Sequence, residues 1–286
     1  MIIDTHVHFI DPTRFQGVPY PDPIEASRLY RTVLPLHYKA ITASHGITGV
    51  IVVEASHWIE DNQWILDLAK KEPLIVGFSG NLDMRANNFE SNLSRFASNS
   101  LFRGIRPRML NPADYSDPKV VNSAALLESY DLEMDAHIVY QDIEHLISLV
   151  NQVPKLRIVI NHIGAGRPIN GKTANQEWAN AMGEISKYPN IYCKVSAVLQ
   201  HSEILPAPYD VDFYRPTLDV LWDLFGENRL VYGSNWPNVE QVGPYSQELG
   251  LAKEYFGEKG NVASEKFFWE NAKVAYKWID RSGEVR

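Results

Sequence analysis

The sequence predicts an α/β protein built as a (β/α)8 TIM barrel. Eight short β-branched or apolar runs recur along the 286 residues, and amphipathic stretches with a nearby Gly or Pro separate them. The runs look buried on both faces, as parallel strands covered by helices are. Eight strands are the number that closes such a barrel. No Gly-x-Gly-x-x-Gly follows the first run, which disfavours the alternative of a dinucleotide-binding open sheet.

The elements alternate regularly along the chain. The predicted strands are residues 2–8, 49–54, 74–79, 102–107, 133–139, 157–162, 191–196 and 230–235. Apolar residues at three- and four-residue intervals predict helices over residues 36–46, 62–73, 89–99, 121–130, 142–154, 178–189, 218–229 and 245–257. Residues 264–280 predict an additional, longer C-terminal helix. No composition shift divides the chain, so we predict one domain over residues 1–286, with the Pro-rich connection 11–27 as an ordered loop over the barrel mouth.

Charge and composition limit the classes of partner that the protein could bind. The formal net charge is -8 and no block of like charge occurs, whereas nucleic acids and anionic membranes require clustered Lys and Arg. No apolar run approaches the length of a membrane span. The single Cys193 fits a reducing cytoplasm. We therefore expect a cytoplasmic protein that acts on a small molecule, with no nucleic-acid or membrane partner and with a homodimer among the assemblies the sequence allows.

Chemically capable side chains end seven of the eight predicted strands. In a parallel barrel the carboxyl ends of the strands surround the active site. Taken singly, a strand-end His is more often a hydrogen-bonded structural residue than a ligand. Four of the nine histidines at such ends favour a site. The strand-end residues are His6, His8, Glu54, Arg103, Arg106, His137, His162, Lys194 and Asn235.

The His6-x-His8 spacing is suited to a metal ion. Residues i and i+2 share one face of a strand, and neutral imidazole is a strong ligand for divalent transition metals. His137 would complete a three-nitrogen set with one position left for water, the usual arrangement of catalytic zinc. The sequence therefore predicts a divalent metal, with zinc favoured.

Other strand-end residues are candidates for binding substrate. Arg103 and Arg106 carry planar forks that suit a carboxylate or an oxygen-rich ring, with a rim salt bridge as the alternative. Two interpretations of Lys194 stay open: it supports an oxyanion, or it pairs with Glu54 inside the mouth. Trp236 is a candidate for stacking on a sugar or aromatic face, although Trp is also an ordinary packing residue.

Seven segments together resemble the amidohydrolase superfamily, within its branch of sugar-lactonase and 2-pyrone-4,6-dicarboxylate lactonase-like proteins. They are "DTHVHF", "FRGIRPR", "MDAHIVYQD", "IVINHIGAG", "NIYCKVSAV", "RLVYGSNWP" and "FFWENAKVAYKW". The resemblance implies a distorted barrel in which His6 and His8 line the metal or substrate pocket. It places His137 at the fifth strand and His162 against the hydrolytic water or the substrate. Some members of this branch work without a metal, so a metal-free site is the alternative to zinc.

The resemblance also implies an Asp on the eighth strand that acts as general base and, where a metal is present, as its ligand. Asn235 stands there, and a neutral amide has no basic site at working pH. Three interpretations follow: a deliberate substitution that slows turnover, a natural residue with His162 or another group as base, or a repurposed binding protein. We favour the first slightly, because every other position of the pattern is intact.

The expected activity is hydrolysis of a sugar-acid lactone or similar cyclic ester. Two alternatives remain. One is a metal-dependent non-oxidative decarboxylase of aromatic or unsaturated acids, and the other is a non-catalytic sugar-acid binding homologue.

Overall fold

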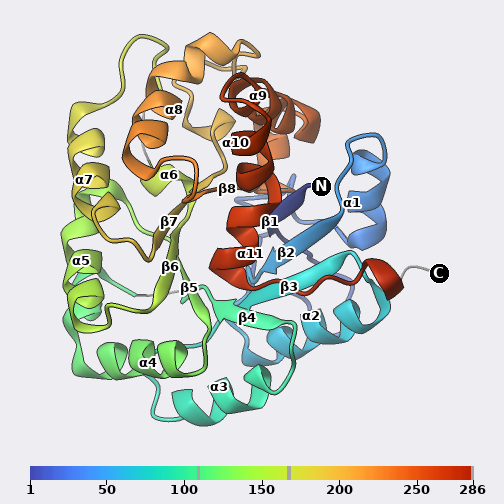
Figure 1. The fold of residues 1–286 in the computed structure, drawn as a ribbon. Coiled ribbons are helices and arrows are strands. Elements are labelled where there is room, and N and C mark those ends of the chain that lie inside the picture. Colours follow the sequence, from blue (N-terminus) through green and yellow to red (C-terminus); the bar gives the residue numbers. More distant parts are fainter. Residues whose placement is uncertain (108–109, 166–168, 285–286) are drawn as a thin grey trace.

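Eight parallel strands in chain order form the inner wall of a barrel, with helices around it (Figure 1). The computed structural model describes residues 1–107, 110–165 and 169–284. The strands are β1 (Ile3–Val7), β2 (Gly49–Val53), β3 (Ile75–Gly80), β4 (Phe102–Ile105), β5 (Glu133–Ala136), β6 (Arg157–Ile160), β7 (Ile191–Val195) and β8 (Leu230–Tyr232). All eight predicted strands are confirmed, and their carboxyl ends differ from the prediction by at most three residues.

The barrel closes irregularly. Neighbouring strands from β1 to β8 pair in parallel ladders, whereas β8 meets β1 through an isolated bridge between Val7 and Trp236. The backbone amide of His8 donates to the carbonyl of Trp236 over 2.9 Å. The prediction of a distorted (β/α)8 barrel is therefore confirmed.

The outer helices pack on the barrel, and α3 (Phe89–Ala97) illustrates how. In α3, Phe89, Leu93 and Phe96 are buried, which is the spacing of a single helix face. The other helices of the ring are α1 (Pro35–Thr42), α2 (Ile59–Lys71), α4 (Pro118–Ser129), α5 (Ile143–Gln152), α7 (Gln176–Ser186), α8 (Val211–Phe225) and α9 (Tyr245–Glu258). Each predicted helix between residues 36 and 257 is present. The short α6 (His162–Ala165) was not predicted.

The C-terminal segment covers the end of the barrel opposite the strand carboxyl ends. It forms α10 (Asn261–Glu265), a π-helical turn over residues 266–270, and α11 (Asn271–Tyr276), which follow one another without a break. The predicted longer helix is therefore present, although it spans residues 261–276 in place of 264–280 and contains a π turn. Lys277, at φ 53°, is left-handed and ends the helix. Tyr276 and Trp278 pack against the early strand residues Ile3 and Val76. The red ribbon of α11 accordingly crosses the barrel in Figure 1.

The connection between β1 and α1 is tied down beside the mouth. Arg14 pairs with the buried Asp61 of α2 at 2.8 Å and stacks over Trp64 at 4.2 Å. Tyr20 of the same segment lines a cavity at the carboxyl ends of the strands. The predicted ordered loop over the mouth is thus seen. Across the described ranges, no helix has both the length and the apolar character to cross a membrane.

Candidate active site

A cavity of about 770 Å³ opens at the carboxyl ends of the strands. This is where a parallel barrel holds its active site. Five predicted site residues reach it, and they come from the ends of five strands: His8, Arg106, His137, His162 and Asn235. Within the described part of the chain, none of the lining residues is an Asp or a Glu. Histidine, arginine, amide and hydroxyl groups therefore supply the chemistry at this surface.

The His6–His8 pair is formed by an irregular β1. The pairing register with β2 shifts between Asp4 and Val7, and such bulges re-aim side chains. The carboxylate of Asp4 accepts from the Tyr38 hydroxyl of α1 at 2.8 Å and so faces the helices. The Nε2 atoms of His6 and His8 lie 3.2 Å apart. The prediction that the two imidazoles meet is confirmed.

His162 is held by a strained left-handed turn. In α6 all four residues, including His162 at φ 52° and Ile163 at φ 51°, have positive φ, a region that costs L-residues energy. The indole Nε1 of Trp178 donates to the Ile163 carbonyl at 2.7 Å. His201 Nε2 lies 3.1 Å from the His162 carbonyl. These two contacts hold the turn, Trp178 from behind the cavity wall and His201 from the cavity lining.

The His162 ring is neutral at physiological pH. Burial, and then the nearby positive potential of His137 and His201, lower its pKa well below the ordinary value of 6.5. Its Nδ1 lies 2.8 Å from the Ser196 hydroxyl. The rings of His6 and His162 have centroids 4.5 Å apart, so β1 and β6 contribute to one cluster.

Lys194 contacts this cluster through His6. Its Nζ is 2.8 Å from Asp135 Oδ1 and 3.2 Å from His6 Nδ1. Tyr276 of α11 donates its hydroxyl to the same Asp135 oxygen at 2.8 Å. Lys194 is fully buried and does not line the cavity. The predicted roles of Lys194 in binding substrate and in pairing with Glu54 are corrected, because its partner is Asp135.

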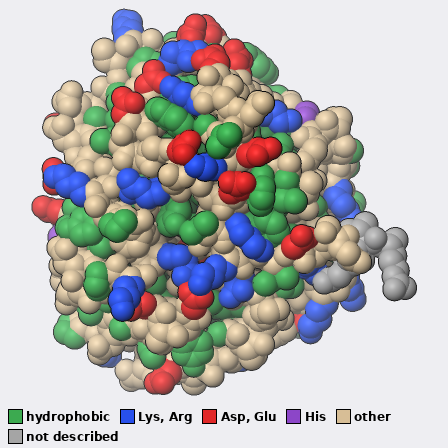
Figure 2. Space-filling view, viewed as in Figure 1, with side chains coloured by type: hydrophobic (Ala, Val, Ile, Leu, Met, Phe, Trp, Pro, Cys, Tyr) green, Lys and Arg blue, Asp and Glu red, His purple; other side chains and the backbone are tan. Residues whose placement is uncertain are grey.

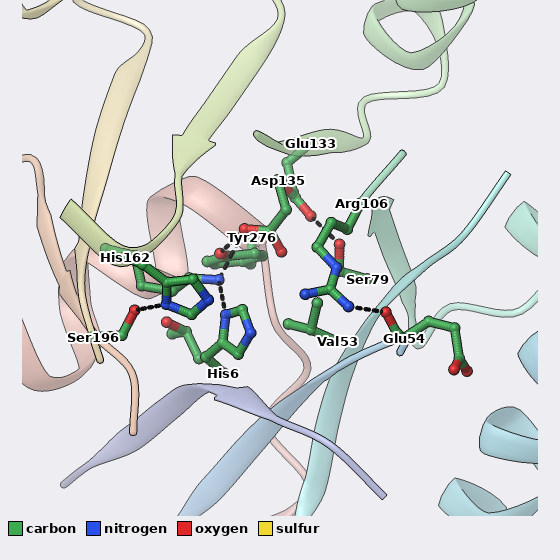
Figure 3. A network of polar contacts seen from close by, with 12 residues as sticks. His6, Val53, Glu54, Ser79, Arg106, Glu133, Asp135, His162, Ser196 and Tyr276 are labelled. Carbon is green, nitrogen blue, oxygen red and sulfur yellow. Dashed lines mark hydrogen bonds and ion pairs between the residues drawn. The ribbon is translucent and has the colours of Figure 1, made fainter. Parts of the chain in front are cut away.

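The side chains of Arg106 and Glu54 point in different directions: Arg106 lines the cavity, whereas Glu54 turns into the barrel wall. The Arg106 guanidinium lines the cavity and donates to the backbone carbonyl of Glu54. The Glu54 carboxylate turns away from Arg106, as Figure 3 shows, and its Oε1 accepts from the Ser56 amide at 2.6 Å. Its Oε2 has no hydrogen-bond partner within the described ranges. Glu54 is therefore no substrate ligand in this structure, and burial raises its pKa to about 7.

Two further predicted substrate ligands lie away from the cavity. Arg103 donates to the carbonyl of Lys277 at 3.3 Å, at the end of the barrel that α11 covers. Figure 2 shows Lys and Arg side chains gathered on that face with acidic groups among them. Trp236 is buried, its indole donates to Glu240 at 2.7 Å, and its ring packs on Tyr38. Both predictions are corrected.

Asn235 belongs to a wall of carboxamides. Its Nδ2 donates to Gln200 Oε1 at 2.7 Å, and its Oδ1 accepts from Asn238 Nδ2 at 3.2 Å. Gln241 lines the cavity beside them. The residue adopts φ 58°, a conformation that Asn tolerates better than most residues. The prediction of Asn235 at the site is consistent with this placement.

The comparisons with known proteins show the family of this chain and its fold. The Amidohydrolase family profile matches residues 3–278. The chain belongs to this family. An L-fucono-1,5-lactonase from Burkholderia ambifaria is 29% identical over 246 residues, which make up 85% of this chain and 82% of that protein.

Solved structures share the barrel. A zinc-bound amidohydrolase from Burkholderia multivorans superposes with a TM-score of 0.86 at 21% identity, over 97% of this chain and 99% of that one. An Acinetobacter baumannii protein described as a probable 2-pyrone-4,6-dicarboxylic acid hydrolase superposes with a TM-score of 0.75 at 16% identity, over 96% and 99%. At these identities the likeness establishes the fold alone.

The residues that the structure describes do not assemble a metal-ligand set. The 3.2 Å between the Nε2 atoms of His6 and His8 suits two ligands of one ion. However, the described residues contain no group of three or more His, Cys, Asp or Glu side chains that could hold one. The ammonium of Lys194 faces His6, and the amide of Asn235 is engaged by Gln200. The predicted zinc site on His6, His8, His137 and Asn235 is thus not formed in this geometry.

Sequence reasoning missed several site residues. Asp135 stands two positions before His137 and Glu133 two before that, so the strand period would place them on one face. The hydroxyl of Ser79 donates to Glu133 Oε1 at 2.9 Å inside the barrel. Ser196, Gln200 and Tyr115 carry no such signal. Ser196 directly follows β7, whereas Gln200 and Tyr115 lie in single 3₁₀ turns over residues 199–201 and 112–116.

Proposed function

We propose that this amidohydrolase opens a sugar-acid lactone or similar cyclic ester by adding water at the mouth of the barrel. The observation that carries the proposal is a neutral, buried His162 in a cavity that also contains Arg106 and a wall of carboxamides. A polyhydroxylated ring requires many neutral donors and acceptors, which this wall supplies. The likeness to an L-fucono-1,5-lactonase supports the same substrate class.

His162 serves as the general base in this proposal. When its Nδ1–H donates to Ser196, its Nε2 retains the lone pair that takes a proton from water. The hydroxide adds to the lactone carbonyl, the ring C–O bond breaks, and His162 returns the proton to the departing alkoxide. A lowered pKa keeps the imidazole unprotonated at neutral pH, although it also makes the ring a weaker base.

Arg106 stabilises the negative charge that develops on the carbonyl oxygen. Its guanidinium is largely buried and fixed by its bond to the Glu54 carbonyl. A pre-positioned cation in a site with little water stabilises an oxyanion more strongly than one in bulk water. The same cation then faces the carboxylate of the product.

A panel of aldono-1,4- and 1,5-lactones, beginning with L-fucono-1,5-lactone, tests the proposal. Hydrolysis releases one proton per turnover, so an indicator assay reports the rate. We expect turnover that His162→Gln and Arg106→Met abolish, while Arg103→Met, at the opposite end of the barrel, leaves it unchanged. Absence of hydrolysis by both the wild type and Asn235→Asp would refute the lactonase proposal.

The same proteins distinguish the two alternatives. A decarboxylase would release carbon dioxide from an aromatic or unsaturated acid and would depend on added metal. A binding homologue would show saturable lactone binding by calorimetry and no turnover, with or without Asn235→Asp. Among the described residues no group forms that could hold a metal ion, which disfavours the decarboxylase. A neutral His162 beside Ser196 supplies a base that a binding homologue would not need.

A further inference from the structure

The two histidines of β1 differ in what their Nδ1 atoms contact. His8 Nδ1 lies 2.7 Å from the backbone carbonyl of Val53. A carbonyl only accepts, so His8 carries its proton on Nδ1 and keeps a lone pair on Nε2. Histidines that bind metals are normally oriented in this way by an acceptor behind the ring. His8 is therefore prepared as a ligand.

The contacts of His6 favour the other neutral tautomer, with the proton on Nε2. Its Nδ1 lies 3.2 Å from Lys194 Nζ, and an ammonium group only donates. His6 Nδ1 must then accept, which leaves the single proton of the neutral ring on Nε2. That N–H donates to His8 Nε2 at 3.2 Å. The contacts form one consistent chain in which Lys194 donates to His6, His6 to His8, and His8 to Val53.

Lys194 is held in a buried ion pair with Asp135. Burial lowers the pKa of the Lys194 ammonium from its usual 10.5, and the pairing with Asp135 opposes that shift. Its Nζ is 2.8 Å from Asp135 Oδ1, and the face of the Tyr276 ring lies 5.3 Å away. Asp135 is fixed in turn by the Tyr276 hydroxyl at 2.8 Å. The C-terminal helix therefore helps to determine the hydrogen bonding of the His6–His8 pair.

We propose that Lys194 is a positioning residue that fixes the His6 tautomer and so prevents the His6–His8 pair from binding a divalent metal ion through both Nε2 atoms. An ion between these atoms would meet the N–H of His6. Turning the His6 tautomer would place an N–H against the Lys194 ammonium, two donors facing each other. The proposal concerns ring tautomers and metal affinity, so it stands independently of lactone hydrolysis.

Lys194→Gln is the informative variant. Its amide group can donate to Asp135 in place of the ammonium, while its carbonyl oxygen can accept from His6 Nδ1–H. The variant thus inverts the His6 tautomer without removing the contact to Asp135. Lys187→Gln, which removes a surface partner of Glu184, is the matched control. His6→Asn in the Lys194→Gln background tests whether any gain depends on His6.

Zinc calorimetry on chelator-treated protein measures the effect. We expect Lys194→Gln to bind zinc at least about tenfold more tightly than the wild type, the lower end of what second-shell changes do to metal sites. Lys187→Gln should match the wild type, and His6→Asn should abolish the gain. Folded Lys194→Gln with wild-type zinc affinity would overturn the proposal, as would tight, His6-dependent zinc binding by the wild type.

Nitrogen-15 NMR of the histidine rings gives a second reading that needs no folded Lys194 variant. Long-range proton–nitrogen spectra distinguish the two neutral tautomers, and the His6 signals are assigned as those missing from His6→Asn. We expect His6 protonated on Nε2 and His8 protonated on Nδ1 in the wild type. A wild-type His6 protonated on Nδ1 would refute the proposal, whatever the variants do.

Discussion

The buried Glu54 carboxyl should make the stability of this protein depend on pH in a way that one substitution removes. Glu54 is 4% exposed, and its Oε2 meets no hydrogen-bond partner among the residues described. Burial disfavours the ionised form and raises the pKa from the ordinary 4.5 to about 7. In the unfolded chain the same group ionises near 4.5, so the folded state holds the extra proton between these two pH values.

The sign and size of the pH effect on the free energy of unfolding follow from the difference between the folded and unfolded pKa values of Glu54. For a raised carboxyl pKa, the stabilising contribution is complete below pH 4.5 and is lost as the pH rises through about 7. At about 1.4 kcal/mol for each pKa unit, the loss amounts to about 3 kcal/mol. Glu54→Gln keeps an oxygen for the Ser56 amide but cannot ionise. The variant should therefore gain up to about 3 kcal/mol relative to wild type between pH 4.5 and pH 8.5.

Urea unfolding followed by tryptophan fluorescence at several pH values provides the assay. The quantity is the free energy of unfolding of Glu54→Gln minus that of the wild type, because titrations shared by both proteins cancel in it. Glu25→Gln, at an exposed position, is the control and should give a flat difference. A flat difference for Glu54→Gln as well would refute the reasoning. A fall in lactonase kcat/KM of about tenfold or more, about 1.4 kcal/mol, would instead show that Glu54 acts in the site.

Four further outcomes are expected. Asn235→Asp should raise kcat on a hydrolysed lactone by about 10²-fold or more, the usual contribution of a well-placed base, and an unchanged kcat would show that position 235 takes no part in proton transfer. The pH profile of kcat/KM should have its acid limb below pH 6.5, since the lowered pKa keeps His162 neutral there, and a midpoint at or above 6.5 would contradict that assignment. Trp178→Phe should cost about 1–3 kcal/mol in urea unfolding by leaving the buried Ile163 carbonyl unpaired, and should also lower kcat; an unaltered kcat would separate the turn from catalysis. Arg106→Lys should reduce kcat/KM although it keeps the charge, because one ammonium cannot replace the fixed fork, whereas Arg103→Lys should behave as wild type.

The polar residues at the ends of the predicted strands were enough to locate the site, because the strands of this barrel are all parallel. Parallel strands in a barrel all direct their carboxyl ends to one side, so His8, His137 and His162 had to meet once eight strand–helix units were recognised. The same reasoning found the His6–His8 pair, since a spacing of two puts side chains on one face. Nothing beyond periodicity and strand order was needed for these predictions.

The direction of individual side chains was harder to predict from the sequence. Arg103 and Arg106 are three positions apart, so a regular strand directs them to opposite sides, and the structure places only Arg106 at the cavity. Glu54 and Trp236 lie at the predicted carboxyl ends of their strands, but their side chains turn into the barrel wall. Glu54 accepts a hydrogen bond from Ser56 there, and Trp236 donates one to Glu240. Ser56 lies in an irregular segment and Glu240 in a short 3₁₀ turn, and no apolar periodicity predicts the backbone angles of either.

The sequence by itself thus determined the barrel, its strand order, the end that carries the site and the histidines that line it, because these follow from alternation and from the polarity of parallel strands. Only the tertiary structure determined the hydrogen-bond partners and the burial of those groups. The partner of Lys194 is Asp135, reinforced by Tyr276 of α11 from the far end of the chain. The left-handed turn that holds His162 depends on Trp178. Hydrogen-bond direction and burial depend on contacts between distant segments, so they are fixed only when the chain has folded.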